Sequence, residues 1–283
     1  MMIRISKRGR HRLRIVAATL VGLLMAFPLI YILLGSLMSG EELSAIPPVI
    51  IPSSLHFSNY PAALSGPNQV IDGRNFLNSV IFTVCAVGLQ WMLCISGGMA
   101  LAKMRFRGRN LITAMYVISL FIPLLATLIP TFIVAYELKL INTYPGLILP
   151  IAAQTGFGTL LFRQYIKQLP QELFDAARMD GASWWVVLRR LVVPLAKPAT
   201  AAYLAISVLT AWNMYLWPLV VAEGGSLQVL TQTLANAGTT GLGQVTPENV
   251  ILASVVIVTL PMIVVFLAVQ PAFVRGLAGS GVD

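Results

Sequence analysis

Charged side chains are scarce in this sequence of 283 residues. Lys, Arg, Asp and Glu together make up 10% of it, whereas a typical soluble domain has about 25%. Hydrophobic residues make up 57%, and the mean hydropathy is +0.82. So few charges cannot cover a water-exposed surface, which argues against a soluble enzyme, and the same composition excludes intrinsic disorder. The composition therefore indicates a protein dissolved in a lipid bilayer.

Six long runs of the sequence contain no charged residue at all. Each approaches or exceeds the roughly 20 residues that a helix needs to cross about 30 Å of hydrocarbon. Their residues do not alternate as the strands of a membrane barrel do. The sequence therefore predicts an all-α membrane protein with six transmembrane helices in a single domain, residues 1–283. The predicted helices cover residues 15–38, 76–102, 111–136, 144–162, 198–222 and 250–274.

The basic residues are distributed unevenly over the predicted loops. Of the 19 Lys and Arg residues, only Arg74 and Lys139 lie on one side of the predicted membrane. Lys and Arg accumulate in cytoplasmic loops, so both termini and the loop 163–197 are predicted to be cytoplasmic. The basic N-terminal tail directly adjoins a spanning helix, which disfavours an alternative role in binding nucleic acid.

Groups for catalysis or ion transport are missing from the six predicted spans, which contain no Asp, Glu, Lys, Arg or His. Without ionisable groups at the membrane midplane or visible internal repeats, a secondary transporter working alone is disfavoured. The sequence also has no Gly-Lys pair, and hence no phosphate-binding P-loop. No catalytic residue, metal site or bound cofactor is therefore predicted, so energy would enter through another subunit. An intramembrane enzyme is disfavoured for the same reason.

The two cysteines, Cys85 and Cys94, both fall in the second predicted helix. Nine residues at about 100° each place them on opposite faces of that helix, so they cannot form a disulfide with each other. Their spacing is not that of a metal-binding motif. Both are expected to be small buried hydrophobic residues.

Proline and glycine interrupt several predicted spans, including Pro123 and Pro130 in the third and Pro150, Gly156 and Gly158 in the fourth. Each proline leaves a backbone carbonyl without its helical partner, and another group in the bundle must satisfy it. Two interpretations are open: kinks that improve packing, or hinges and the lining of a polar cavity.

The loop between the fourth and fifth predicted spans has the clearest local signals. Pro170 is typical of a helix start, and Glu172 falls in the first turn, where the helix dipole favours negative charge. Gly181 can take the left-handed conformation that ends a helix, and Ser183 can cap a second one. Pro194 then limits that second helix. The sequence predicts a protruding helical hairpin of the kind that docks into a groove on a soluble partner.

This hairpin resembles the EAA loop of ABC importer permeases, which reads E-A-A-x₃-G-x₉-I-x-L-P. The segment Asp175-Ala176-Ala177, then Gly181, then Leu191-x-Val193-Pro194 keeps that spacing, with Asp for Glu, Leu for Ile and Val for Leu. Other segments look like carbohydrate-uptake permeases related to the second maltose permease subunit. These segments are Asn78-Ser79, Asn142 to Leu147, Trp212-Asn213 and the tail from Gln270 to Leu277, so the match covers nearly the whole chain.

The resemblance implies a type I ABC importer permease fold in the bacterial cytoplasmic (inner) membrane, surrounded by lipid. It implies a heterodimer with a second permease subunit, a dimer of ABC ATPases that holds ATP and Mg, and an extracytoplasmic sugar-binding protein. The chain would be the membrane-spanning subunit of an ATP-driven sugar importer. The residues implied to couple it to the ATPase are Glu172, Asp175, Ala176, Ala177, Asp180, Gly181, Leu191 and Pro194.

A neutral sugar is recognised by hydrogen bonds and aromatic faces rather than by charges. The candidate groups for a substrate path within the spans are Asn78, Gln154, Trp212, Asn213 and Tyr215. Packing or hydrogen bonding between helices is the alternative role for each of them. The absence of cations from the spans disfavours the alternative substrate class, a phosphorylated polyol of the glycerophosphate type.

Overall fold

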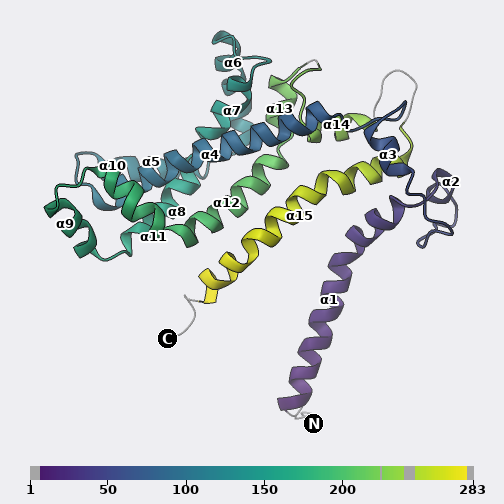
Figure 1. Ribbon diagram of the computed structural model, residues 1–283, viewed down its shortest axis with the longest axis horizontal. Coiled ribbons are helices and arrows are strands. Elements are labelled where there is room, and N and C mark those ends of the chain that lie inside the picture. Colours follow the sequence, from purple (N-terminus) through teal and green to yellow (C-terminus); the bar gives the residue numbers. More distant parts are fainter. Residues whose placement is uncertain (1–6, 224, 239–245, 279–283) are drawn as a thin grey trace. The chain divides into compact units, whose positions relative to one another are not determined.

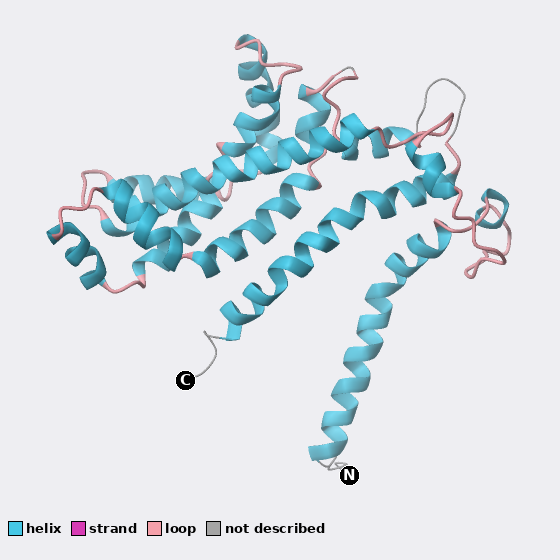
Figure 2. Cartoon of the chain, viewed as in Figure 1, coloured by secondary structure: helices cyan, strands magenta, loops and turns pink. Residues whose placement is uncertain are grey.

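The computed structural model describes residues 7–223, 225–238 and 246–278, and these residues form helices joined by turns and loops, with no strand among them (Figure 1; Figure 2). The chain divides into two compact units, Met1–Asp72 with Leu234–Thr259, and Gly73–Thr233 with Leu260–Asp283. Helices α14 (Leu230–Ala237) and α15 (Glu248–Ala278) each run through a boundary between the units. The prediction of one domain over residues 1–283 stays a prediction.

The first unit contains the first predicted span. Helix α1 (Lys7–Gly35) carries an apolar stretch, Arg14–Gly35, that is long enough to cross a membrane. It ends three residues before the predicted boundary because the chain turns at Ser36–Met38. The same unit contains α2 (Gly40–Leu43), α3 (Asn59–Leu64) and the first part of α15.

A buried asparagine holds the turn after α1 in place. The side-chain amide of Asn59 donates hydrogen bonds of 2.9 Å to the carbonyl oxygens of Ser36 and Met38. Its own oxygen accepts a hydrogen bond from the amide of Asn249, also 2.9 Å long. Backbone carbonyls that follow the helix end are therefore satisfied by one side chain, as buried polar groups require.

Helix α4 (Gly73–Lys103) is the longest helix that lies mainly in the second unit, and it matches the second predicted span. It packs against α7, α8 and α12. The remaining helices of this unit before α14 are α5 (Arg109–Ser119), α6 (Leu124–Glu137), α7 (Tyr144–Ala152), α8 (Gly156–Lys167), α9 (Gln171–Met179), α10 (Trp184–Val187), the π-helical turn η1 (Leu188–Val192), α11 (Val193–Leu195), α12 (Lys197–Trp212) and α13 (Leu216–Val221).

The third and fourth predicted spans are not single straight helices. Helices α5 and α6 meet at 106°, and α7 and α8 meet at 45°. The bend of the third span comes directly before Pro123, which has no N–H to donate and disfavours the helical conformation at the residue before it. The fourth span is interrupted at residues 153–155 and continues to Lys167, five residues beyond its predicted end.

The fifth predicted span is also interrupted, at residues 213–215 between α12 and α13. Among the described residues, three helices are long and apolar enough to cross a membrane, and up to six spans result if each bent pair of helices counts as one. The third bent pair is the segment Trp184–Leu195 with α12, which meet at 80°. The described residues therefore agree with an all-helical membrane protein, and the predicted spans 111–136, 144–162 and 198–222 each contain an interruption.

The cysteine prediction was half right. Cys94 is buried and Cys85 is exposed, which confirms that they lie on opposite faces of α4. The expectation that both are buried was wrong, because Cys85 is exposed in the part of the chain that the structure describes.

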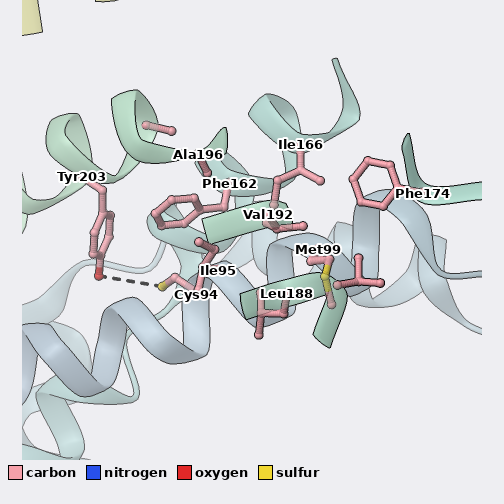
Figure 3. Packing of buried hydrophobic residues seen from close by; sticks show 12 residues of the cluster. Cys94, Ile95, Met99, Phe162, Ile166, Phe174, Leu188, Val192, Ala196 and Tyr203 are labelled. Carbon is pink, nitrogen blue, oxygen red and sulfur yellow. Dashed lines mark hydrogen bonds between the residues drawn. The ribbon is translucent and has the colours of Figure 1, made fainter. Parts of the chain in front are cut away.

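Two clusters of buried side chains hold the second unit together. The α4–α8 cluster, shown in Figure 3, joins α4 and α8 to the loop that follows them. Its buried residues are Cys94, Ile95, Met99, Phe162, Ile166, Phe174, Val187, Leu188, Val192, Ala196, Ala199 and Tyr203. The α4–α13 cluster is built from Phe82, Ala86, Val87, Ala135, Leu147, Ile151, Ala211, Met214, Trp217, Val221 and Val229.

Candidate coupling loop and substrate path

The first helix of the predicted hairpin, α9, begins and ends as the sequence indicates. Pro170 is its N-cap, and Glu172 lies in its first turn. Gly181 has a φ of 77°, in the left-handed region. The N–H of Gly181 donates to the carbonyl of Arg178, and the N–H of Ala182 donates to the carbonyl of Ala177. This pair of bonds is the Schellman motif, so the glycine makes the turn that was predicted for it.

The second helix of the hairpin starts at the predicted cap. The hydroxyl of Ser183 accepts a hydrogen bond of 3.4 Å from the N–H of Val186. The segment then runs through α10, the wide turn η1 and α11, and it includes Pro194 rather than stopping before it. A proline cannot supply the N–H of a regular helical turn and crowds the carbonyl four residues earlier. The π-helical turn directly before α11 gives the chain room to pass that position without ending the helix.

The hairpin is packed firmly against α4 and α8. Phe174 of α9 is 1% exposed and belongs to the α4–α8 cluster, together with Val187 and Val192 of the second helix. The ammonium group of Lys103, the last residue of α4, donates to the carbonyl of Leu169 at 2.8 Å and lies 4.5 Å from the centre of the Phe174 ring. A cation over an aromatic face adds to the apolar packing. The hairpin is therefore placed to move with α4 and α8 as one body.

The outer surface of the hairpin combines acidic and apolar side chains. Five of the predicted coupling residues that lie in or just after α9 are exposed, namely Glu172, Asp175, Ala176, Asp180 and Gly181. Large apolar side chains that the sequence analysis did not select are exposed beside them: Leu173 (40%), Met179 (88%) and Trp185 (69%). Their exposure on an otherwise well-packed hairpin is the signal of a partner surface.

Two other predicted coupling residues face inward. Ala177 and Leu191 are half-buried and pack against the α4–α8 cluster, so they hold the hairpin in place. Pro194 is exposed in α11. Asp175 accepts a hydrogen bond of 3.0 Å from the side-chain amide of Gln171, one turn earlier. The structure thus separates the predicted set into an exposed group and a packed group, which their spacing alone could not do.

Asn78, the first predicted residue of the substrate path, is completely buried. Its amide donates to the carbonyl oxygens of Ser226 and Gln228, at 3.1 Å and 3.0 Å. Its oxygen accepts a hydrogen bond of 2.7 Å from the hydroxyl of Tyr144. Asn78 therefore fastens the segment before α14 to α4 and α7, and its side chain is not accessible to a solute in this conformation.

Gln154 lies in the break between α7 and α8, and its side chain is exposed. The backbone carbonyl of Gln154 accepts a hydrogen bond of 2.6 Å from the side-chain amide of Gln90 on α4. The same amide donates to the backbone carbonyl of Ile151 at 3.3 Å. The hydroxyl of Tyr203 on α12 in turn donates to the Gln90 oxygen at 2.8 Å. These bonds satisfy the carbonyls that the helix break leaves without helical partners.

The three predicted residues near the end of α12 lie in different environments. Trp212 is 7% exposed and its ring meets that of Phe76 edge to face, with 6.1 Å between the centroids. Asn213 is exposed, and its amide donates to the carbonyl of Leu209 at 2.9 Å. Tyr215 is half-buried at the start of α13. Of the five predicted path residues, Gln154, Asn213 and Tyr215 are at least partly accessible, and all three lie in the interruptions of the spans.

The described part of the chain has no cluster of side chains that could bind a metal ion. Across residues 7–223, 225–238 and 246–278, no group of three or more His, Cys, Asp or Glu side chains could hold a metal ion. The prediction that this chain binds no cofactor of its own stays a prediction.

Comparison with known proteins finds transport-system permeases similar to this chain. The family model described as "Binding-protein-dependent transport system inner membrane component" matches residues 94–279. The arabinooligosaccharides transport system permease protein AraQ of Bacillus subtilis (strain 168) is 33% identical over 269 residues, which are 93% of this chain and 92% of that protein. The sn-glycerol-3-phosphate transport system permease protein UgpE of Salmonella typhi is 33% identical over 257 residues, 90% of this chain and 91% of its own length.

A solved structure has the same fold. The crystal structure of a bacterial ABC transporter involved in the import of the acidic polysaccharide alginate contains a chain that superimposes on this one with a TM-score of 0.81. The two chains are 26% identical, and the match covers 95% of this chain and 99% of that one. The exposed hairpin, the interrupted apolar helices and these similarities agree: the chain belongs to the family of binding-protein-dependent transport system inner membrane components, and it is a multi-pass ABC importer permease of the inner membrane.

Proposed function

We propose that this chain is the membrane-spanning subunit of an ATP-driven sugar importer and is coupled to a dimer of ATPases through the loop 170–194. A second permease subunit completes the translocation path, and an extracytoplasmic binding protein delivers the sugar. The observation that carries the proposal is the hairpin itself. It presents Glu172, Asp175, Met179 and Trp185 to solvent while Phe174 fixes it to the ends of α4 and α8.

The orientation in the proposal follows from the charges. The hairpin loop and both termini are on the side that carries all but two of the basic residues, which is the cytoplasmic side in inner-membrane proteins. The ATPases that hold ATP and Mg²⁺ are also cytoplasmic. Six spans are proposed: α1, α4 and α15, the bent pairs α5–α6 and α7–α8, and α12 together with α13, while the hairpin stays outside the membrane.

Coupling in this arrangement is mechanical. A partner that grips the exposed tip of α9 moves α4 and α8 with it, because Phe174 and Lys103 tie the hairpin to both. Binding at the tip can change the conformation of the spans only if the partner binds the hairpin more tightly in one state than in the other. The closing of the ATPase dimer on ATP supplies that difference.

A neutral sugar is the substrate class that we favour. AraQ, by its name, belongs to a system for arabinooligosaccharides, and UgpE to one for sn-glycerol-3-phosphate, and the two are equally similar to this chain. The six charge-free runs supply no Lys, Arg or His to neutralise a phosphate. A glycerophosphate-type substrate is the alternative, and it would need cations from the partner permease.

The coupling role is tested by replacing Gly181 with Asp in the assembled importer. Gly108 provides a matched control, because it also has a left-handed φ (87°), and neither residue has another atom within 4 Å of its added Cβ. Both substitutions therefore impose the same backbone strain of about 1 kcal/mol within this chain. We expect Gly181→Asp to abolish the stimulation of ATP hydrolysis by the loaded binding protein, and Gly108→Asp to preserve it.

The matched pair separates docking from folding. If Gly181→Asp kept the same stimulated hydrolysis as Gly108→Asp, the hairpin would not be the site that the ATPase grips. Co-purification of the ATPase with each variant gives an independent measure, and we expect less ATPase with Gly181→Asp only.

A further inference from the structure

A cavity of about 720 Å³ opens where the bend of the third span faces the break of the fourth. The two spans approach closely beside it, since a Cβ added to Gly156 would lie 2.6 Å from the hydroxyl oxygen of Ser119. Residues from α5, α6 and the start of α8 form its walls. Its lining includes Tyr116, Ser119, Gln154, Thr155, Gly156 and Phe157.

Both interruptions lie near the middle of their charge-free runs. The bend at residues 120–123 comes about ten residues into the run 111–136, and the break at 153–155 comes about ten residues into the run 144–162. Ten helical residues rise about 15 Å, which is half of the hydrocarbon thickness of about 30 Å. The cavity is therefore expected at the midplane of the membrane.

Backbone that is not helical is tolerated at this depth only where it contacts other protein or lines a water-filled cavity. Where the break packs against α4, Gln90 donates hydrogen bonds to the backbone carbonyls of Ile151 and Gln154. The side chains of Phe121 and Gln154 are not covered by this packing and are exposed. A lipid tail could not pair with the Gln154 amide, so the exposed side of the break requires an occupant that forms hydrogen bonds.

The polar groups of the cavity are suited to a neutral polyol. The side-chain amide of Gln154 and the hydroxyls of Tyr116 and Thr155 have no hydrogen-bond partner within the part of the chain that the structure describes. They can both donate to and accept from sugar hydroxyls, and the rings of Tyr116 and Phe157 provide apolar faces. Among the described residues, those that line the cavity are all uncharged. Its volume falls within the usual range for small-molecule sites, about 300–1,000 Å³.

We infer that this midplane cavity is the part of the sugar path that this chain contributes. Gln154, Thr155 and Tyr116 form transient hydrogen bonds with the sugar as it crosses the membrane. The inference rests on the proposed function and makes it more specific. It retains Gln154 from the residues expected from sequence, and it adds Tyr116 and Thr155. Gln90 and Tyr203 are positioning residues, because Gln90 donates to the backbone of the break and Tyr203 donates to Gln90, while neither lines the cavity.

Uptake of radiolabelled arabinotriose by the complete importer in vesicles tests the role of Gln154. The control is Gln164→Leu, because Gln164 is an exposed glutamine of α8 that does not line the cavity. We expect Gln154→Leu to lower the maximal uptake rate about tenfold, the factor for one or two lost hydrogen bonds, and Gln164→Leu to change it less than twofold. The KM, which the binding protein sets, should stay the same for both. Equal uptake rates for the two variants would overturn the inference.

Access from water gives a second, independent measurement. In the importer carrying Cys85→Ala and Cys94→Ala, we expect Gln154→Cys to react with the membrane-impermeant reagent 2-sulfonatoethyl methanethiosulfonate, and arabinotriose to slow the reaction. Ile129→Cys is the control, since Ile129 of α6 is 69% exposed but lies outside the cavity, and it should react slowly. If the cysteine at position 154 were as unreactive as the one at 129, lipid or a partner helix would fill the cavity and the inference would be wrong.

Failure of the inference can be distinguished from failure of the proposed function. Normal arabinotriose uptake by both the parent importer and Gln154→Leu would overturn the cavity assignment and leave the importer role intact. A parent importer that takes up sn-glycerol-3-phosphate but not arabinotriose would overturn the neutral-sugar class, and the cavity assignment with it.

Discussion

The crossing of α4 and α8 at Gly98 offers a quantitative test of the packing that joins the coupling hairpin to the spans. A Cβ at position 98 would lie 2.7 Å from the Cβ of Phe162, 2.8 Å from the backbone nitrogen of Arg163 and 3.0 Å from the carbonyl oxygen of Thr159. Two of these three atoms belong to the backbone of α8 and cannot rotate away. Gly98→Ala therefore forces the two helices apart.

The expected cost follows from the distances. Ordinary contacts of a Cβ begin at about 3.4 Å, so the helices must separate by about 0.6 Å near Arg163. A gap of that size forfeits a quarter to a half of the dispersion energy at each contact across it. Overpacking of this kind costs about 1–3 kcal/mol, from which the higher helix propensity of alanine recovers about 1 kcal/mol.

Gly88 of the same helix is the matched control, because nothing lies within 4 Å of a Cβ added there. Gly88→Ala should gain the propensity term without the packing cost, so the two variants should differ by about 1–3 kcal/mol. At roughly 2–4 °C per kcal/mol, thermal unfolding of the purified importer in detergent, followed by tryptophan fluorescence, resolves this difference. Equal melting temperatures for Gly98→Ala and Gly88→Ala would refute the close crossing of α4 and α8.

Two further predictions concern segments outside that crossing. Asn78→Leu leaves the carbonyls of Ser226 and Gln228 and the Tyr144 hydroxyl without their Asn78 partner, which costs about 2–4 kcal/mol of stability. We therefore expect proteases to cleave the segment before α14 faster in this variant. Unchanged cleavage would contradict the role of Asn78 in fastening that segment. Hydrogen bonds to Glu42, first from the Ser53 hydroxyl and then from the backbone N–H groups of Ser39 and Ser53, lower the pKa of its carboxyl from 4.5 to about 2. The folded-state pKa is depressed, so this carboxylate stabilises the turn fully above about pH 4.5 and loses that effect as the pH falls through about 2. Amide exchange at Ser53 should therefore differ between the parent protein and Glu42→Gln at pH 6 and converge near pH 2, whereas a difference that persisted at pH 2 would contradict the assignment.

Local signals in the sequence predicted the coupling hairpin well. Pro170, Gly181 and Ser183 each act through atoms within about five residues along the chain, and each does what its type and position indicate. Pro194 was expected to end the second helix. Instead, the helix continues through Pro194, and the π-helical turn directly before α11 accommodates the proline.

The interruptions of the spans were less predictable. The prolines and glycines of the third and fourth spans indicated either kinks or the lining of a cavity, and composition cannot decide between them, because a freed carbonyl can be satisfied in several ways. The structure distinguishes these interpretations through contacts between helices. Gln90 of α4, itself bonded by Tyr203 of α12, donates to the backbone carbonyls at the break before Gly156.

Composition and local motifs are enough to identify a membrane protein, the stretches that are apolar enough to cross the bilayer, and the position of the turn in the hairpin. Those properties depend on the average chemistry of consecutive residues in a nearly uniform solvent, or on hydrogen bonds between near neighbours. The different roles of Asn78, a buried clamp, and Gln154, which faces a cavity, follow from contacts between residues far apart in the chain. Both are amides in apolar runs, and their roles depend on partners such as Gln228, which lies 150 residues from Asn78 along the chain.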